Sequence, residues 1–166
     1  MPANVMSLEL GGVVACGLGE GVRFTSIDWV VEEFRRKLGF VPHPGTFNLR
    51  MAGARWDVAR PRLLAATGIA ITPSAGFCAA KCFPVVLAGR ISGALVLPDL
   101  HDYPGDKFEV VAPVPVREAL GVGNGDRVTL QIDIRRGALP LPIGAAPRPP
   151  APPPRETARL TRGERS

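Results

Sequence analysis

The segment from Pro42 to Asn48 carries the residues whose types and spacing most clearly suggest chemistry. Its sequence is P-H-P-G-T-F-N, so two prolines stiffen the approach and Gly45 allows a sharp bend. If the chain is extended there, Thr46 and Asn48 project to the same side. A hydroxyl and an amide oxygen are hard ligands that suit Mg²⁺, which keeps waters and phosphate oxygens at its other positions. The alternative is that both side chains bond their own backbone at a turn, which is the commoner arrangement.

A glycine-rich segment, G-L-G-E-G at residues 17–21, is a second candidate. Its three glycines let backbone amides approach an anion, and successive N–H groups can form a concave anion site. The spacing is not G-x-G-x-x-G, and no obvious strand–helix–strand unit surrounds it. From spacing alone, a structural turn is the commoner interpretation. The glycine content argues against any regular helix or strand here.

Two further positions carry charge where a strand or helix begins. Glu109 is a lone carboxylate in the apolar run F-E-V-V-A-P, and it could accept hydrogen bonds from a polyol or a ring N–H. Arg117 follows Pro115 at the start of a predicted short helix, where helix-start amides and a guanidinium could meet phosphate. The alternatives are a solvent-facing charge and a surface ion pair.

Apolar periodicity predicts one principal helix among the elements that must position these residues. Its buried face would hold Ile27, Val30, Val31, Phe34 and Leu38. We expect Ser26 to cap this helix and Gly39 to end it. A second, short helix is predicted from Pro115 through Leu120. Residues 52–75 are ambiguous; a helix near 57–66 is possible if Pro61 lies in its first turn.

Short apolar segments separated by glycine and proline turns predict about six strands. They lie near residues 5–15, 47–51, 77–87, 91–97, 107–111 and 127–134, with a polar loop at 99–106. Such a pattern favours a mainly β fold, a small barrel, over a doubly wound sheet. We therefore expect a barrel domain over residues 1–136 and a Pro/Arg-rich disordered tail over residues 137–166.

Composition excludes several classes of protein. Apolar residues make up 46% of the 166, enough for a core, but no run approaches the ~20 needed to span a bilayer. Three cysteines cannot build a disulfide framework, and with no convincing targeting segment they favour a cytoplasmic protein. The sequence contains no P-loop, G-x-S-x-G or H-E-x-x-H motif. Most of the net charge of +5 belongs to the tail, which makes nucleic-acid binding by the folded part improbable.

Taken together and in order, these segments resemble the CTP-dependent riboflavin kinase family over roughly residues 9–134. The resemblance rests on G-L-G-E-G (17–21), L-G-F-V-P-H-P-G-T-F-N (38–48), G-A-L-V-L-P (93–98), F-E-V-V-A-P (108–113), R-E-A-L (117–120) and G-D-R-V (125–128). It implies a six-stranded cradle-loop barrel.

The resemblance also implies residue roles. Thr46 and Asn48 would bind one Mg²⁺ ion. His101 and Glu109 would contact the flavin, with Glu109 a candidate catalytic residue. The nucleotide would be held by Leu18, Gly19, Glu20, Gly21, Val22 and Arg23 on one side and by Val114, Pro115, Val116 and Arg117 on the other. The family often has basic residues where Val22 and Pro115 stand, and a hydroxyl residue where His101 stands.

The reaction implied is transfer of the γ-phosphate of CTP to the 5′-hydroxyl of riboflavin, giving FMN and CDP, by a monomer. In such transfers the protein mainly positions the hydroxyl in line with the phosphate and neutralises the charge of the phosphate oxygens. One alternative is a flavin- or nucleotide-binding sensor without catalysis, which the missing basic residues make plausible. Another is nucleic-acid binding through the arginine-rich tail, which deletion of residues 138–166 would test.

Overall fold

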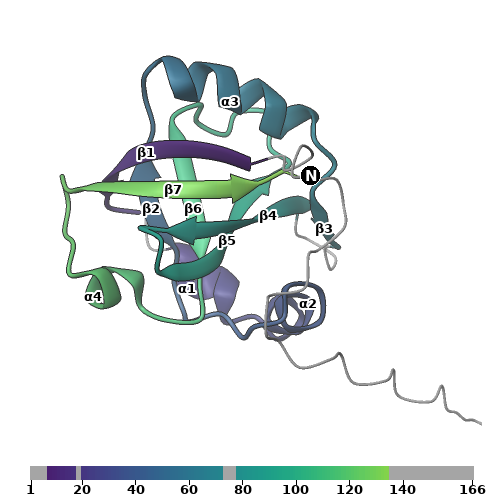
Figure 1. The fold of residues 1–166 in the computed structure, drawn as a ribbon. Coiled ribbons are helices and arrows are strands. Elements are labelled where there is room, and N and C mark those ends of the chain that lie inside the picture. The colour runs from purple at the N-terminus through teal and green to yellow at the C-terminus, as the bar shows by residue number, and fades with distance from the viewer. Residues whose placement is uncertain (1–6, 18–19, 73–77, 135–166) are drawn as a thin grey trace, which may run out of the picture.

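The computed structural model describes residues 7–17, 20–72 and 78–134 of the chain (Figure 1). These residues form seven strands and four helices. The strands are β1 (Ser7–Ala15), β2 (Phe47–Arg50), β3 (Ile69–Ile71), β4 (Ala80–Leu87), β5 (Ile91–Pro98), β6 (Lys107–Val111) and β7 (Arg127–Asp133). The helices are α1 (Glu20–Thr25), α2 (Asp28–Leu38), α3 (Ala54–Ala65) and α4 (Val116–Leu120).

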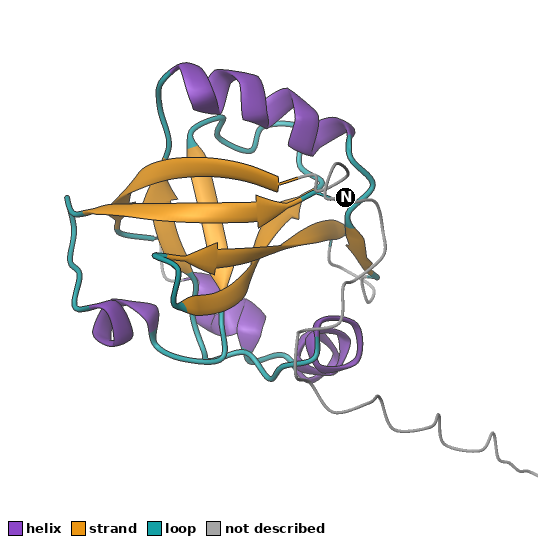
Figure 2. Ribbon diagram, in the orientation of Figure 1, coloured by secondary structure: helices purple, strands orange, loops and turns teal. Residues whose placement is uncertain are grey.

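Six of the strands close into an antiparallel barrel. The sheet order is β3-β4-β5-β6-β2-β1-β7, and β4 pairs with β7 as well as with β5, which joins the two ends. The short strand β3 lies outside this ring and pairs only with β4 in the described sheet. The predicted fold class, a mainly β six-stranded barrel, is therefore confirmed (Figure 2).

Strand alternation fills the barrel with apolar side chains. On β2, Phe47 and Leu49 are buried in the main core cluster, whereas Asn48 between them belongs to the opposite face. On β6, Phe108 and Val110 are buried in the same cluster, and Glu109 between them is only partly buried. The two polar residues of interest therefore lie outside the barrel core on neighbouring strands.

Helix α2 has the predicted extent and stop but not the predicted cap. Gly39 follows it in the left-handed conformation with φ 84°, and its N–H bonds to the carbonyl of Phe34. The prediction that Ser26 caps the helix is wrong. The cap position is Ile27, and the Ser26 hydroxyl donates to the carbonyl of Val22 at 2.7 Å, at the end of α1.

Helix α3 covers one end of the barrel and is longer than the sequence suggests (Figure 1). Trp56, Ala59 and Leu63 fall at helical spacing and are buried in the main core, so packing holds the helix together. Pro61 lies in its interior rather than its first turn. Pro61 is exposed, so the carbonyl that loses its helical partner can be solvated.

The glycine-rich segment is also more regular than predicted. The expectation that residues 17–21 avoid regular structure is wrong for Glu20 and Gly21, because α1 begins at Glu20. Leu18 and Gly19 lie outside the described residues, as do the predicted start of the strand near residue 77 and the predicted tail from residue 137. The predicted domain boundary at residue 136 is likewise outside them.

The two ends of the described barrel lie side by side. Ser7 at the start of β1 is paired with Asp133 at the end of β7. The opposite end of β1, at Ala15, leads into the glycine-rich segment and so toward the candidate site. None of the described helices combines the length and the apolar composition that a membrane-spanning helix requires.

Candidate functional site

The candidate site is centred on β2, which lies between β1 and β6. In the antiparallel register Asn48 is opposite Ala15 on one side and opposite Glu109 on the other. Side chains directly opposite each other in neighbouring strands share a face, so Asn48 and Glu109 meet outside the core. Thr46, two residues before Asn48, joins them on that face.

Hydrogen bonds connect these three side chains. The Thr46 hydroxyl donates to Oε1 of Glu109 at 3.2 Å. The amide Nδ2 of Asn48 donates to both the carbonyl and the hydroxyl oxygen of Thr46, each at 3.2 Å. The other amide atom, Oδ1 of Asn48, is buried and has no hydrogen-bond partner among the described residues. A buried acceptor without a partner costs free energy unless a ligand satisfies it.

These residues fit the magnesium ion that the resemblance implies. The unpartnered Oδ1 of Asn48 is an available neutral oxygen ligand, and the same amide donates through Nδ2 to the Thr46 hydroxyl. That hydroxyl accepts one hydrogen bond and donates one, which leaves it a further lone pair. Mg²⁺ binds through few protein oxygens when phosphate oxygens and waters complete its shell. The described residues contain no cluster of three or more His, Cys, Asp or Glu side chains for a metal.

Glu109 has two more partners, which the sequence analysis missed. The phenol of Tyr103 donates to Oε2 of Glu109 at 2.6 Å, and Nζ of Lys107 lies 3.3 Å from the same oxygen. Burial raises the pKa of Tyr103, and the hydrogen bond to Glu109 and the charge of Glu109 raise it further. Tyr103 is therefore a neutral donor at physiological pH. The sequence did contain a signal for this contact: Tyr103, an aromatic residue with a hydroxyl, lies in the polar loop shortly before Glu109.

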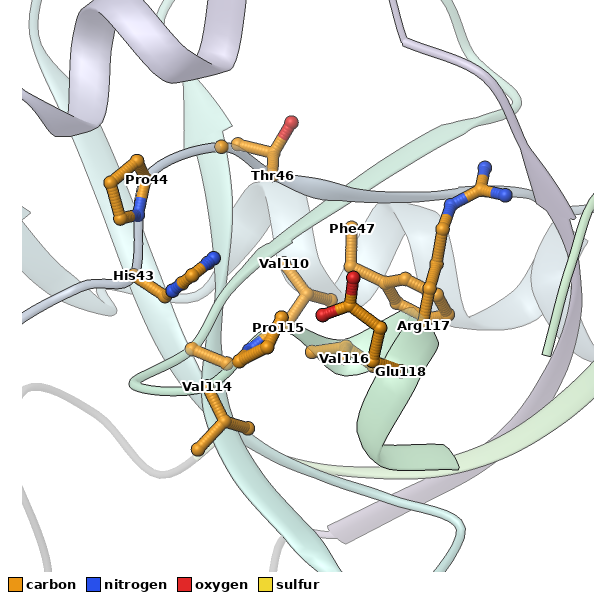
Figure 3. A pocket seen from close by; sticks show the side chains of 12 residues that line it. His43, Pro44, Thr46, Phe47, Val110, Val114, Pro115, Val116, Arg117 and Glu118 are labelled. Carbon is orange, nitrogen blue, oxygen red and sulfur yellow. The ribbon is translucent and has the colours of Figure 1, made fainter. Parts of the chain in front are cut away.

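A cavity of about 180 Å³ opens beside Thr46. One wall is residues 43–47 and the other is the segment that leads into α4. Figure 3 shows Thr46 above this space and the segment carrying Val114, Pro115 and Val116 across from it, with Arg117 and Glu118 rising from α4. The structure thus brings Val114–Arg117 to the same cavity as Thr46, although they are far apart in sequence.

Arg117 connects the end of β1 to the turn before β7 at the edge of this cavity. Its Nη2 donates to the carbonyl of Ala15 at 3.1 Å and to Oδ1 of Asn124 at 2.6 Å. Ala15 is the last residue of β1 and is opposite Asn48. Arg117 therefore holds α4 against the point where the glycine-rich segment starts.

Close approach explains the first glycine of that segment. A Cβ on Gly17 would lie 2.5 Å from Nδ2 of Asn48, so a larger residue would displace the Asn48 amide. At the end of α1, which follows this segment, Oγ1 of Thr25 accepts a hydrogen bond from the N–H of Gly45 at 2.7 Å. Gly45 has φ 105°, which favours glycine. Helix α1 is thus fastened to the turn that carries Thr46.

The remaining predicted site residues are less closely assembled. Val22 and Arg23 are exposed on α1, and Val22 lies near Gly45. Glu20 and Gly21 form the first turn of that helix. His101 is exposed in the loop between β5 and β6, and no contact between His101 and Glu109 is found among the described residues. This loop reaches Glu109 through Tyr103 instead.

The sequence of this chain matches a known protein family and several of its members. Residues 14–132 match the family model CTP-dep_RFKase, which is described as a domain of unknown function, DUF120. The chain is 39% identical over 129 residues to the riboflavin kinase of Methanosarcina barkeri and 37% identical over 134 residues to that of Pyrobaculum islandicum.

These alignments cover 75% and 78% of this chain but only 56% and 62% of the two relatives. The chain therefore spans a little over half the length of the curated relatives it matches. The matched region includes the whole candidate site, from the end of β1 through β7. On this evidence, the chain belongs to the CTP-dependent riboflavin kinase family.

Proposed function

We propose that this chain is a riboflavin kinase that transfers the γ-phosphate of CTP to the 5′-hydroxyl of riboflavin, giving FMN and CDP. One observation carries the proposal. The Asn48 amide, whose buried oxygen has no partner among the described residues, is hydrogen-bonded to Thr46, which in turn bonds the Glu109 carboxylate and lines the cavity whose other wall is Val114–Arg117. In this proposal the protein acts as a monomer in the cytoplasm.

The Thr46 hydroxyl and the Asn48 amide oxygen would hold one Mg²⁺ ion. When bound, the ion supplies positive charge that neutralises the phosphate oxygens during transfer. Neutral protein ligands suit this role because the triphosphate itself contributes anionic oxygens. Gly17 leaves the space that the Asn48 amide requires, and Glu109 accepts the hydrogen bond that orients the Thr46 hydroxyl.

The nucleotide would lie between two segments, one on each side of it. Residues 18–23 would wrap it with backbone amides, and Val114–Arg117 would close the other side. The start of α1 adds two N–H groups at Glu20 and Gly21 that are not needed inside that helix. The contact of Arg117 with the carbonyl of Ala15 supports this arrangement, because it joins Arg117 to the strand end that precedes the glycine-rich segment.

The flavin would be held by His101 and Glu109. Glu109 is bonded to Thr46, so a substrate hydroxyl that reaches Glu109 would be next to the expected ion. Glu109 could then orient this hydroxyl or accept its proton if the two lie within ~3 Å of each other. Direct phosphoryl transfer forms no covalent bond to the protein, so the remaining roles of the protein are positioning and charge stabilisation.

The second candidate function is a flavin- or nucleotide-binding sensor without catalysis. It is favoured by the small number of positive charges beside the cavity. Val22 and Pro115 are uncharged, and the Arg117 guanidinium already contacts the Ala15 carbonyl and Asn124. Such a site could hold a nucleotide through backbone amides without stabilising the charge of phosphoryl transfer.

Product formation separates the two functions. The purified chain is mixed with riboflavin, Mg²⁺ and either CTP, ATP or GTP, and FMN is measured by chromatography. FMN formed with CTP, and lost when a chelator removes the metal, supports the kinase. Flavin binding without FMN from any donor supports the sensor and rules out the kinase activity of this chain.

Glu109→Ala tests the chemical role of the carboxylate in the same assay. If Glu109 orients or deprotonates the substrate, this variant binds riboflavin more weakly and, at saturating riboflavin, forms FMN roughly a hundredfold more slowly. A variant that binds flavin normally and turns over at the wild-type rate would remove Glu109 from the chemistry.

A further inference from the structure

Tyr103 is the single tyrosine of the chain, and it lies in the loop between β5 and β6 that also carries His101. Its phenol donates to Oε2 of Glu109 at 2.6 Å. A hydrogen bond of this length to a carboxylate is charge-assisted and stronger than a bond between neutral groups. The strength of this hydrogen bond suggests that Tyr103 does more than pack the loop against the barrel.

The two oxygens of Glu109 have different partners. Oε1 accepts from the Thr46 hydroxyl, whereas Oε2 is bound by the Tyr103 phenol and by Nζ of Lys107. The Lys107 ammonium also lies 5.4 Å from the centre of the Tyr103 ring, so the three groups form one cluster. With both oxygens engaged, the plane of the carboxylate is fixed, and Oε1 is directed at Thr46.

Tyr103 itself is held firmly by its surroundings. Its ring is partly buried and packs against the main core cluster. Its N–H donates to the Leu100 carbonyl at 3.3 Å, and the indole N–H of Trp56 in α3 donates to the carbonyl of Gly105 at 2.9 Å. The loop is therefore tied to α3, and Tyr103 transmits the position of the loop to Glu109.

We propose that Tyr103 is a positioning residue: its phenol holds the Glu109 carboxylate toward Thr46 and so couples the His101 loop to the expected metal end of the site. This inference rests on the proposed function for its kinetic consequence but not for the contact itself. Lys107 contributes charge to the same oxygen, while Tyr103 supplies the directed hydrogen bond.

Tyr103→Phe removes only the hydroxyl and keeps the ring in the core. We expect kcat for FMN formation to fall about tenfold, the effect of losing one hydrogen bond to a charged group. We expect the KM for riboflavin to change less than about twofold, because the orientation of Glu109 is lost rather than the binding surface. In a Glu109→Ala background the same substitution should have no further effect, because Tyr103 acts through Glu109.

Asp102→Asn is the matched control, since Asp102 is the exposed neighbour of Tyr103 in the same loop. It should leave kcat and KM at wild-type values. Equal losses from Tyr103→Phe in the wild-type and Glu109→Ala backgrounds would overturn the proposal. So would a rise in KM for riboflavin with unchanged kcat, which would make Tyr103 a binding residue only.

The single tyrosine also allows a test without turnover. An isotope label on the ring carbon that bears the hydroxyl gives one nuclear magnetic resonance signal, which reports the hydrogen bond of Tyr103 alone. Glu109→Ala should shift this signal and Asp102→Asn should not. A signal unmoved by Glu109→Ala overturns the inference. If the wild-type chain forms no FMN, the proposed function fails, whereas this signal still decides whether Glu109 is held by Tyr103.

Discussion

Two carboxylates sit in partly buried polar clusters of this barrel, and their surroundings differ. Glu33 on α2 is bound by Arg36 at 2.6 Å and by Lys37 at 2.7 Å, and it accepts the backbone N–H of Thr72 at 3.1 Å. Glu109 on β6 is bound by Thr46, Tyr103 and Lys107, but its cluster includes a buried amide oxygen, on Asn48, with no partner in the described part of the chain.

The difference separates a structural cluster from a site. Around Glu33 the donors come from its own helix and from the end of β3, so the cluster fastens α2 to the sheet. Around Glu109 the partners come from the residue before β2, from β6 itself and from the β5–β6 loop, and the Asn48 amide oxygen is left without a partner among the described residues. A buried polar group without a partner is a cost that folding alone does not explain, whereas a ligand would satisfy it.

The largest expected effect comes from removing that acceptor. Asn48→Ala should lower the rate of FMN formation about a hundredfold, because it deletes a proposed ligand of the ion that neutralises phosphate charge. The free energy of unfolding should change by less than about 1 kcal/mol, since one unsatisfied buried oxygen disappears together with two long hydrogen bonds. Steady-state turnover and urea unfolding measure the two quantities.

Gln131→Ala is the control for that variant. Gln131 is an exposed amide on β7 that donates a hydrogen bond to the Glu9 carboxylate, away from the candidate site. It should leave turnover unchanged. If Asn48→Ala turned over at the wild-type rate, or lost much stability, the Glu109 cluster would be structural like the Glu33 cluster, and the comparison would fail.

Glu33→Gln should show the opposite pattern, a loss of stability with unchanged turnover. Replacing the carboxylate weakens three charge-assisted contacts, and we expect the free energy of unfolding to fall by about 2 kcal/mol. Glu32→Gln on the same helix should cost less than about 0.5 kcal/mol, because its ion pair with Arg35 is exposed. Urea unfolding of the two variants side by side makes the test, and equal losses would contradict it.

The pH dependence of stability provides the smallest and sharpest effect. Burial acts against the charged form of Glu33, but hydrogen bonds from Lys37, the Thr72 N–H and Arg36 lower its pKa below the ordinary value of 4.5. A lowered pKa in the folded state stabilises the fold above the unfolded-state pKa and loses that effect as pH falls through the folded-state pKa.

The stability advantage of the wild type over Glu33→Gln should therefore be complete at neutral pH and shrink as the pH falls below 4.5. Unfolding curves recorded from neutral to acidic pH measure this difference. An advantage that stays constant across the range would mean that Glu33 does not act through its charge.

Local rules predicted most of the barrel correctly. The helix ending at Gly39 followed from apolar spacing and a left-handed glycine, and the strands followed from alternation between turns. The approach of Thr46, Asn48 and Glu109 also follows from alternation once β2 and β6 are known to be neighbours. This strand pairing is a long-range property that the local patterns do not encode; the family resemblance implied only that these residues belong to one site.

The failures have physical causes. Helix α3 begins at Ala54 despite its interior Pro61, because burial of Trp56 and Leu63 outweighs the lost hydrogen bond. Ser26 does not cap α2 because the preceding helix α1 offers its hydroxyl the Val22 carbonyl. Tyr103 escaped notice because its bond to Glu109 depends on how the 99–106 loop folds back, which no periodicity encodes.

The pairing of Ser7 with Asp133 has a practical consequence for anyone who modifies this protein. Both ends of the described barrel emerge at one corner, and β1 then runs nine residues to Ala15 at the site. At about 3.3 Å per residue, a dye attached at Ser7 or Asp133 lies up to roughly 25 Å from Ala15. Immobilising the protein through that corner should leave the candidate site facing the solution.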